Sequence, residues 1–269
     1  MRAQRVRDAA YRMRHHVLNM GEAQGQGYVG QALGAADMLA AVYVDQLTYR
    51  AEDPHWEGRD RFLLSTGHYA IGLYAALAEA GIIDPDELDS YGSDDSRLPM
   101  SGMASYTPGM EISGGSLGHG LTVAVGMALG LRHQGSQARV INFLSDGELD
   151  EGSTWEAAMG ASHHRLGNLI AMVDINALQA DGPTAGVLRT EPVADRWLTS
   201  GPPAAGMPSG WTATTSTPCW PHSTASASNS RRSSCATPRS AAACRCSRNG
   251  RRRTSCASTP TSGSSAATS

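Results

Sequence analysis

The sequence of 269 residues has no lysine and only two phenylalanines, and its first cysteine is Cys219. The lack of cysteine over residues 1–218 excludes a disulfide framework there and is typical of proteins from a reducing compartment. No apolar run approaches the roughly 20 residues that a membrane-spanning helix needs, and the N-terminus does not resemble a secretory signal peptide. We therefore expect a cytoplasmic protein that has no membrane partner.

Acidic residues are missing from one part of the chain. All 25 Asp and Glu residues precede Arg196, as do 13 of the 22 Arg residues, so residues 1–195 carry a net charge of −12. Residues 196–269 hold the other nine Arg, and they also lack Ile, Val, Phe and Tyr. This contrast predicts a folded domain over residues 1–197 and a low-complexity, disordered tail over residues 198–269.

Apolar segments of two kinds alternate along the first part of the chain. Short apolar runs predict strands at 61–65, 139–145 and 168–175. Helix-like patterns are found at 2–20, 34–47, 69–81, 121–133 and 153–167, the last with Trp155, Met159 and Leu166 on one face. This alternation predicts an α/β fold in which a parallel sheet has helices on both faces.

Three polar residues fall at or just after the ends of predicted strands. They are His68, Asp146 and Asn176. Parallel α/β sheets bind ligands at the carboxyl ends of their strands. We therefore expect these three side chains to line one edge of the sheet.

The stretch "LSDGELDEGSTWEAAM" (144–159) holds five acidic residues where a strand passes into a helix. Glu148, Asp150 and Glu151 fall at the start of that helix, where acids are favoured by about 0.3–1 kcal/mol each through the helix dipole. Asp146 lies on the strand side, and it pairs across one strand–helix–strand unit with Asn176. Carboxylate and amide oxygens are ligands that Mg²⁺ and Ca²⁺ prefer, so helix capping and metal binding both remain open.

Two further patterns carry little weight as sites. "GQGYVG" (25–30) fits a dinucleotide-binding turn, but such a turn follows a strand, whereas a charged amphipathic helix precedes it here. It is better explained as a glycine-rich turn between helices. His163 and His164 are neighbours on a helix and point about 100° apart, which disfavours a shared metal.

Several segments resemble transketolases. They are "DRFLLSTGHYAIGLYAALAEAG", "TPGMEISGGSLGHGLTVAVGMALG" and "SDGELDEGSTWEAAMGASHHRLGNLIAMVDINALQADG", which occur in the family's order. The last is similar to the family's thiamine diphosphate signature, in which GDG is followed about thirty residues later by Asn. The resemblance covers roughly residues 5–197. It implies a thiamine-diphosphate-binding fold that corresponds to the amino-terminal half of the family.

The resemblance also implies roles for individual residues. Mg²⁺ or Ca²⁺, bound by Asp146, Asn176 and the backbone carbonyl of Leu178, would anchor the diphosphate of thiamine diphosphate. The residues implied in cofactor binding are His68, Gly115, Ser116, Leu117, Asp146, Gly147, Glu148 and Asn176. His68 and Glu151 are the implied catalytic residues, with Glu151 supporting the subunit interface near the cofactor. The cofactor's thiazolium carbanion would carry a two-carbon unit from a ketose to an aldose.

Three positions depart from the family pattern. The first glycine of GDG is Ser145, and two substrate-facing histidines of the family correspond to Tyr28 and Ser101. These changes touch substrate specificity more than cofactor binding, so an unusual ketose phosphate is the expected substrate. The family's second domain, whose glutamate activates the aminopyrimidine ring, is absent. A separate C-terminal transketolase subunit is therefore the implied partner, in an assembly of the α₂β₂ type.

The tail allows three interpretations. A disordered basic tail would contact nucleic acid, although we expect no such partner, and a zinc site at Cys235, Cys244, Cys246 and Cys256 lacks the usual spacing. The third uses the genetic code. Read in the neighbouring frame from Ala205, the tail permits W-(D/H)-A-V-x-V-D-G-(D/H)-D-L, which resembles the transketolase pattern "GWxVxxxDGHDL". We infer a frameshift between about Trp197 and Ala205.

The function expected from the sequence is that of a transketolase-like chain which acts on sugar phosphates together with a partner subunit. Two alternatives stay open. One is a component of another thiamine diphosphate enzyme, such as a 2-oxoacid dehydrogenase. The other is a non-catalytic, frameshifted remnant.

Overall fold

A computed structural model describes residues 1–199 and 211–215, with side chains through Trp197. The longer helices are α1 (Arg2–Gln24), α2 (Val29–Ala41), α3 (Ala70–Glu79), α4 (Gly120–His133) and α5 (Gly152–His163). The strands are β1 (Arg61–Leu64), β2 (Val140–Ser145), β3 (Leu169–Ile175), β4 (Leu178–Gln179), β5 (Gly182–Pro183) and β6 (Trp211–Thr215). Two short helices, α6 (Thr184–Val187) and α7 (Val193–Thr199), follow β5.

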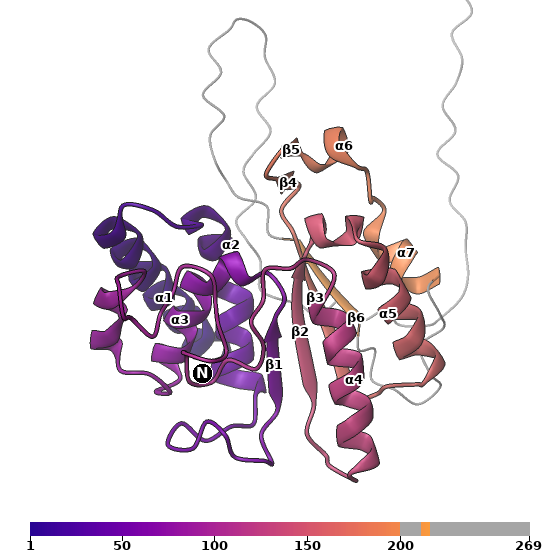
Figure 1. Ribbon diagram of the computed structural model, residues 1–269, viewed down its shortest axis with the longest axis horizontal. Helices are drawn as coiled ribbons and strands as arrows, with labels where there is room; N and C mark the ends of the chain where they lie inside the picture. The colour runs from indigo at the N-terminus through magenta and orange to yellow at the C-terminus, as the bar shows by residue number, and fades with distance from the viewer. Residues whose placement is uncertain (200–210, 216–269) are drawn as a thin grey trace, which may run out of the picture. The chain divides into compact units, whose positions relative to one another are not determined.

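The main sheet has four strands in the order β1-β2-β3-β6, and every pairing in it is parallel (Figure 1). This confirms the predicted α/β fold. The pair β4 and β5 forms a small antiparallel hairpin. Strand β6 lies within the segment for which we predicted disorder, so these five residues do not follow that prediction. The remaining residues of that segment beyond Thr199 lie outside the described part of the chain.

The first face of the sheet packs against α1, α2 and α3. Side chains that alternate along the strands, such as Phe62, Leu64 and Phe143, share one apolar cluster with these helices. Helix α3 is buried at every position from Ala70 to Ala78, and α1 and α2 both contact it. A helix that is apolar all round is stable only when it is enclosed in this way.

The second face packs against α4 and α5. Strand residues of the opposite alternation, Leu63, Val140 and Leu144, lie in this second cluster. The buried positions of α5 are Thr154, Ala157, Ala158 and Ala161. The face that the sequence offered for burial is different, because Met159 is 52% exposed. Small side chains let the helix approach its neighbours closely, and the bulky Met159 stays outside.

The turn between α1 and α2 is the plain glycine-rich turn that the sequence favoured. Gly25 ends α1 in the left-handed conformation, with φ 71°, and Gly27 has φ 140°. Helix α2 begins at Val29, five residues before the predicted start. A π-helical turn at Val42–Gln46 continues it. In the described part of the chain, no helix combines the length and the apolar character needed to cross a membrane.

Candidate functional site

The strand register brings the three predicted polar residues to one edge of the sheet. Leu64 pairs with Phe143, and Ser145 pairs with Asp174, so β1, β2 and β3 end at neighbouring levels. His68, Asp146 and Asn176 follow these three ends. The loops after β2 and β3 are joined directly, because the backbone N–H of Ala177 donates to Asp146 Oδ2 over 2.7 Å.

Asp146 is nearly buried and is held by backbone donors. Its Oδ1 accepts from the N–H of Gly147 at 3.0 Å, and Thr184 Oγ1 lies 3.4 Å from Oδ2. Burial raises the pKa of this carboxyl, and the nearby Asp174 carboxylate raises it further, although the backbone donors oppose the change. A cation placed beside Asp146 would relieve this unfavourable charge.

Asn176 is fixed by both ends of its side-chain amide. Its Nδ2 donates to Tyr69 Oη at 2.9 Å and to Asp174 Oδ2 at 3.1 Å. Its Oδ1 accepts from the backbone N–H of Leu178 at 2.9 Å and has a second lone pair to offer. Sequence reasoning missed Tyr69 and Asp174, because neither stands in a recognisable pattern.

The glycine-rich loop over residues 113–118 packs against the end of β1. A Cβ on Gly67 would lie 2.4 Å from the carbonyl of Gly114, and Gly115 has φ 114°, a conformation that favours glycine. The N–H of Gly115 donates to the carbonyl of Ser65 at 2.9 Å. The loop that carries the predicted residues Gly115, Ser116 and Leu117 is therefore adjacent to His68.

Glu148 lies beneath these loops, and its side chain is fully buried. Its Oε1 accepts from Ser65 Oγ and from the N–H of Gly118, the latter at 3.0 Å, and its Oε2 has no protein partner. Burial raises the pKa of Glu148 to about 7. The carboxyl thus ties the end of β1 to the glycine-rich loop, and its predicted role in cofactor binding remains a prediction.

His68 forms part of an aromatic group at the same edge. Its ring centroid is 4.8 Å from that of Tyr28 and 4.8 Å from that of Tyr69, both in edge-on contact. Burial lowers the pKa of His68, which keeps the imidazole neutral at neutral pH. Ser101 is close by, since a Cβ on Gly115 would lie 3.4 Å from its Oγ. The two departures noted in the sequence, Tyr28 and Ser101, therefore both lie near His68 or the glycine-rich loop.

Large apolar side chains surround this edge and remain exposed. Tyr28 is 51% exposed and Leu178 is 58% exposed. The others near the edge are Met103, Tyr106, Val187 and Leu188. Glu151, which the resemblance places at a subunit interface, is also exposed. Clustered apolar exposure of this kind marks an interaction surface.

The donors at the edge suit a hard divalent cation. They comprise one carboxylate (Asp146), one amide oxygen (Asn176) and the backbone near Leu178, and Mg²⁺ typically takes few protein oxygens and shares the rest with phosphate. In residues 1–199 and 211–215, no three His, Cys, Asp or Glu side chains gather as a metal cluster. That finding includes His163 and His164, so the helix-surface interpretation of this pair stands.

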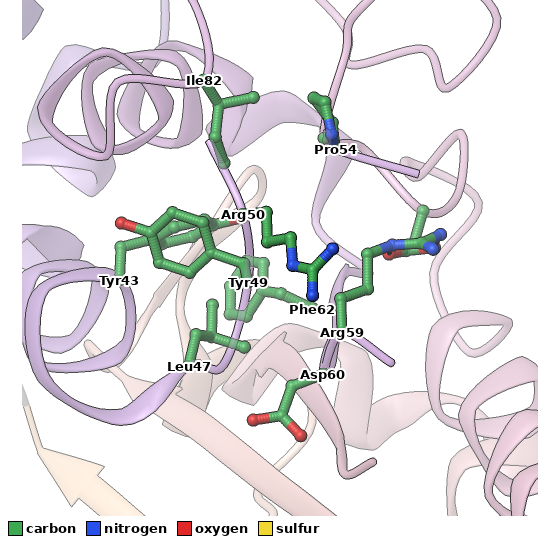
Figure 2. A pocket seen from close by; sticks show the side chains of 11 residues that line it. Tyr43, Leu47, Tyr49, Arg50, Pro54, Arg59, Asp60, Phe62 and Ile82 are labelled. Carbon is green, nitrogen blue, oxygen red and sulfur yellow. Dashed lines mark hydrogen bonds and ion pairs between the residues drawn. The ribbon is translucent and has the colours of Figure 1, made fainter. Parts of the chain in front are cut away.

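A second hollow lies at the opposite end of β1 and does not fit a ligand. Its walls include Tyr43, Tyr49, Arg50 and Arg59 (Figure 2). Its volume of about 20 Å³ holds roughly one water molecule. The guanidinium of Arg59 is already paired with the Glu111 carboxylate at 2.8 and 3.0 Å.

Comparison with known proteins agrees with this site. Residues 6–204 match the family described as "Transketolase, thiamine diphosphate binding domain". The chain is 66% identical over 190 residues to a transketolase family protein of Sinorhizobium fredii, which covers 71% of this chain and 68% of that protein. It is 41% identical over 188 residues to one of the subunits of the apulose-4-phosphate transketolase of Actinobacillus succinogenes, covering 70% and 68%.

The fold agrees as well. The transketolase from Leishmania mexicana superposes with a TM-score of 0.70 at 30% identity, over 73% of this chain and 31% of that one. The chain therefore spans about a third of that solved transketolase. With the family's domain matched over most of its length and the family's fold present, the chain belongs to the transketolase family and carries its thiamine diphosphate binding domain.

Proposed function

We propose that this chain is the cofactor-diphosphate subunit of a two-subunit transketolase, which moves a two-carbon ketol unit from a ketose phosphate to an aldose. The observation that carries the proposal is the junction of the Asp146 and Asn176 loops at the carboxyl edge of the sheet. It occurs in a chain that matches the family's thiamine diphosphate binding domain.

Mg²⁺ is the proposed metal, with Ca²⁺ as a substitute. Asp146, Asn176 and the carbonyl of Leu178 would hold it, because these are hard oxygen donors on two loops that are hydrogen-bonded to each other. The metal would neutralise diphosphate charge in a domain whose first 195 residues carry 25 acids against 13 Arg. Gly147 would allow the backbone to approach the phosphates closely.

The remaining residues of the site would orient the cofactor and the substrate. Bound thiamine diphosphate supplies the carbanion chemistry that ketol transfer needs. The glycine-rich loop would line the cofactor, and His68, held neutral by burial, would offer one nitrogen as donor and the other as acceptor. Glu151 would act at the junction with the partner.

A separate C-terminal subunit is the proposed partner. Two features support it. The exposed apolar side chains around the edge, among them Leu178 and Tyr28, suit coverage by another protein surface. The relative from Actinobacillus succinogenes is itself named as one subunit of a transketolase, which is the name of one part of a larger enzyme.

The proposed substrate is an unusual ketose phosphate. Tyr28 contacts His68 at 4.8 Å and presents a bulky phenol where the family pattern has a histidine. The apulose-4-phosphate enzyme among the relatives acts outside the common sugar-phosphate pair. Ketol-transfer assays with the assembled enzyme would decide this, because normal kinetics with xylulose and ribose phosphates would contradict it.

Cofactor binding is the first test of the proposed function. We expect the full chain to bind thiamine diphosphate in a calorimetric titration with Mg²⁺, and to lose binding when EDTA is added. Replacing Asp146 with Ala should weaken binding at least about 100-fold, since loss of an outer-shell partner already costs about 10–100-fold. Asp181→Ala, at an exposed acid beside β5, is the control and should bind normally. No binding by the wild-type chain would contradict the proposal.

The residues after about position 200 are proposed to be out of frame. The family match ends at residue 204, close to where acidic residues stop. Sequencing codons 190–215 from an independent template tests this. A gained or lost base there would support a complete subunit, whereas an unchanged sequence would favour the non-catalytic remnant.

A further inference from the structure

Three buried side chains form a closed ring of hydrogen bonds beneath the Asn176 loop. Tyr69 Oη donates to Asp174 Oδ2 at 3.0 Å, and Asn176 Nδ2 donates to that same carboxylate oxygen at 3.1 Å. Asn176 Nδ2 also donates to Tyr69 Oη at 2.9 Å, which closes the ring. The ring joins the turn that precedes α3 to the end of β3, across 105 and 107 residues of sequence.

The ring determines which way the Asn176 amide faces. A carboxylate only accepts hydrogen bonds, so the amide atom next to Asp174 must be the nitrogen. Both N–H groups of that nitrogen are used, one by Asp174 and one by Tyr69. The amide oxygen is therefore turned away from the ring, toward the N–H of Leu178. This is the atom that the proposed function assigns to the metal.

Tyr69 is suited to hold this arrangement. Its ring is 1% exposed and contacts Phe143 and His68, with centroids 5.9 Å and 4.8 Å away. Burial and the Asp174 carboxylate raise the pKa of the Tyr69 phenol, so it remains protonated and remains a donor. Tyr69 follows directly after His68, so one short turn contributes both a residue at the edge and a residue beneath it.

We propose that Tyr69 is a positioning residue, which acts through Asn176 to point the amide oxygen at the divalent cation that anchors the diphosphate. This inference rests on the proposed function, since it assumes a cation at Asn176. It adds that the ligand is oriented by a phenol from the β1 side of the sheet. Hydrogen-bonded partners of metal ligands generally have this role, and their loss lowers metal affinity about 10–100-fold.

The test compares two tyrosines near or within α3. Tyr69→Phe removes the hydroxyl of the ring and keeps the aromatic packing. Tyr74→Phe is the matched control, because Tyr74 is equally buried and its Oη donates to the carbonyl of Pro99 at 2.7 Å, outside the Asn176 ring. The full chain is titrated with Mn²⁺ in the presence of thiamine diphosphate, and free Mn²⁺ is followed by electron paramagnetic resonance. Thermal unfolding without metal is measured in parallel.

We expect Tyr69→Phe to weaken Mn²⁺ binding about 10–100-fold, and Tyr74→Phe to bind within about twofold of wild type because its hydrogen bond is not part of the ring. Both variants should lower the unfolding midpoint to a similar degree. Asp174→Asn is a second variant, because an amide there would allow the Asn176 amide to turn over; it should weaken binding as Tyr69→Phe does.

The outcomes separate the two proposals. Binding by wild type together with unchanged binding by Tyr69→Phe and Asp174→Asn would overturn the positioning role and leave the proposed function standing. Equal weakening by Tyr69→Phe and Tyr74→Phe would also overturn it, because the effect would then follow stability alone. If Tyr69→Phe does not fold, Asp174→Asn against Tyr74→Phe decides. If the wild-type chain binds no Mn²⁺ with thiamine diphosphate, the proposed function fails and this inference fails with it.

Discussion

The two faces of the sheet are covered to different depths. On the first face α3 is enclosed along its whole length, because α1 and α2 pack over it (Figure 1). On the second face α4 and α5 form a single layer, and Val123 and Met159 on these helices are 40% and 52% exposed. The glycine-rich loop and the Asp146 loop lead into α4 and α5, so two loops of the site belong to the thinly covered face.

This difference separates stability from function within one domain. The first face holds the fully buried large side chains of α3, which contribute most to the free energy of unfolding. The second face uses small residues such as Ala124, Ala158 and Ala161, whose burial contributes less. Substitutions on each face, taken from the largest expected effect to the smallest, test whether the two faces differ in this way.

The largest effect is expected from a cavity on the first face. Leu73 of α3 is 1% exposed, and Leu73→Ala should lower the free energy of unfolding by about 2–5 kcal/mol. Urea unfolding followed by circular dichroism measures this change. A loss under about 1 kcal/mol, well below the range for buried leucines, would show that the doubly covered face is not the main source of stability.

A pH-dependent effect is expected from Glu148, where the site loops meet the sheet. Because its pKa is raised to about 7 in the folded state, the protonated form is favoured there. Its contribution is fully present below its unfolded pKa of about 4.3 and is lost as pH rises through about 7. Relative to Glu148→Gln, the wild-type chain should lose roughly 3 kcal/mol across this window.

The measurement for Glu148 is urea unfolding at several pH values with a chelator present. Gln keeps the shape and an oxygen acceptor for Gly118 but does not titrate. Other groups titrate equally in both proteins, so their contributions cancel in the difference. Parallel stability curves for the two proteins would contradict the raised pKa.

The smallest effect is expected from the outer surface of the second face. Met159→Ala removes a side chain that is half exposed on α5, so the free energy of unfolding should change by less than about 0.5 kcal/mol. The same urea assay applies. A loss approaching that of Leu73→Ala would indicate that Met159 is covered in solution, for instance by a partner or a second copy.

Local patterns in the sequence predicted the sheet and the edge where the site lies. The apolar runs at β1, β2 and β3 are short and continuous, and the polar residues that follow them meet because parallel strands end at one edge. The helix boundaries were less accurate. Helix α2 starts earlier than predicted because its first turn holds small residues and Gly30, which show no strong periodicity.

The ring of Tyr69, Asp174 and Asn176 was not predictable from such patterns. Its members are separated by up to 107 residues, and a tyrosine inside an apolar helical segment is typical of a core residue. Glu148 was equally hidden, because an acid at the start of a helix is explained by the helix dipole alone. Its partner Ser65 lies 83 residues away in sequence.

These separations have a consequence for the order in which the molecule assembles. Contacts between distant residues form late in folding, because the chain between them must first lose its freedom. During synthesis Tyr69 and His68 leave the ribosome long before Asp174 and Asn176 have been translated. The cofactor therefore cannot act as a template for the nascent domain, and its binding reports that the sheet is already complete.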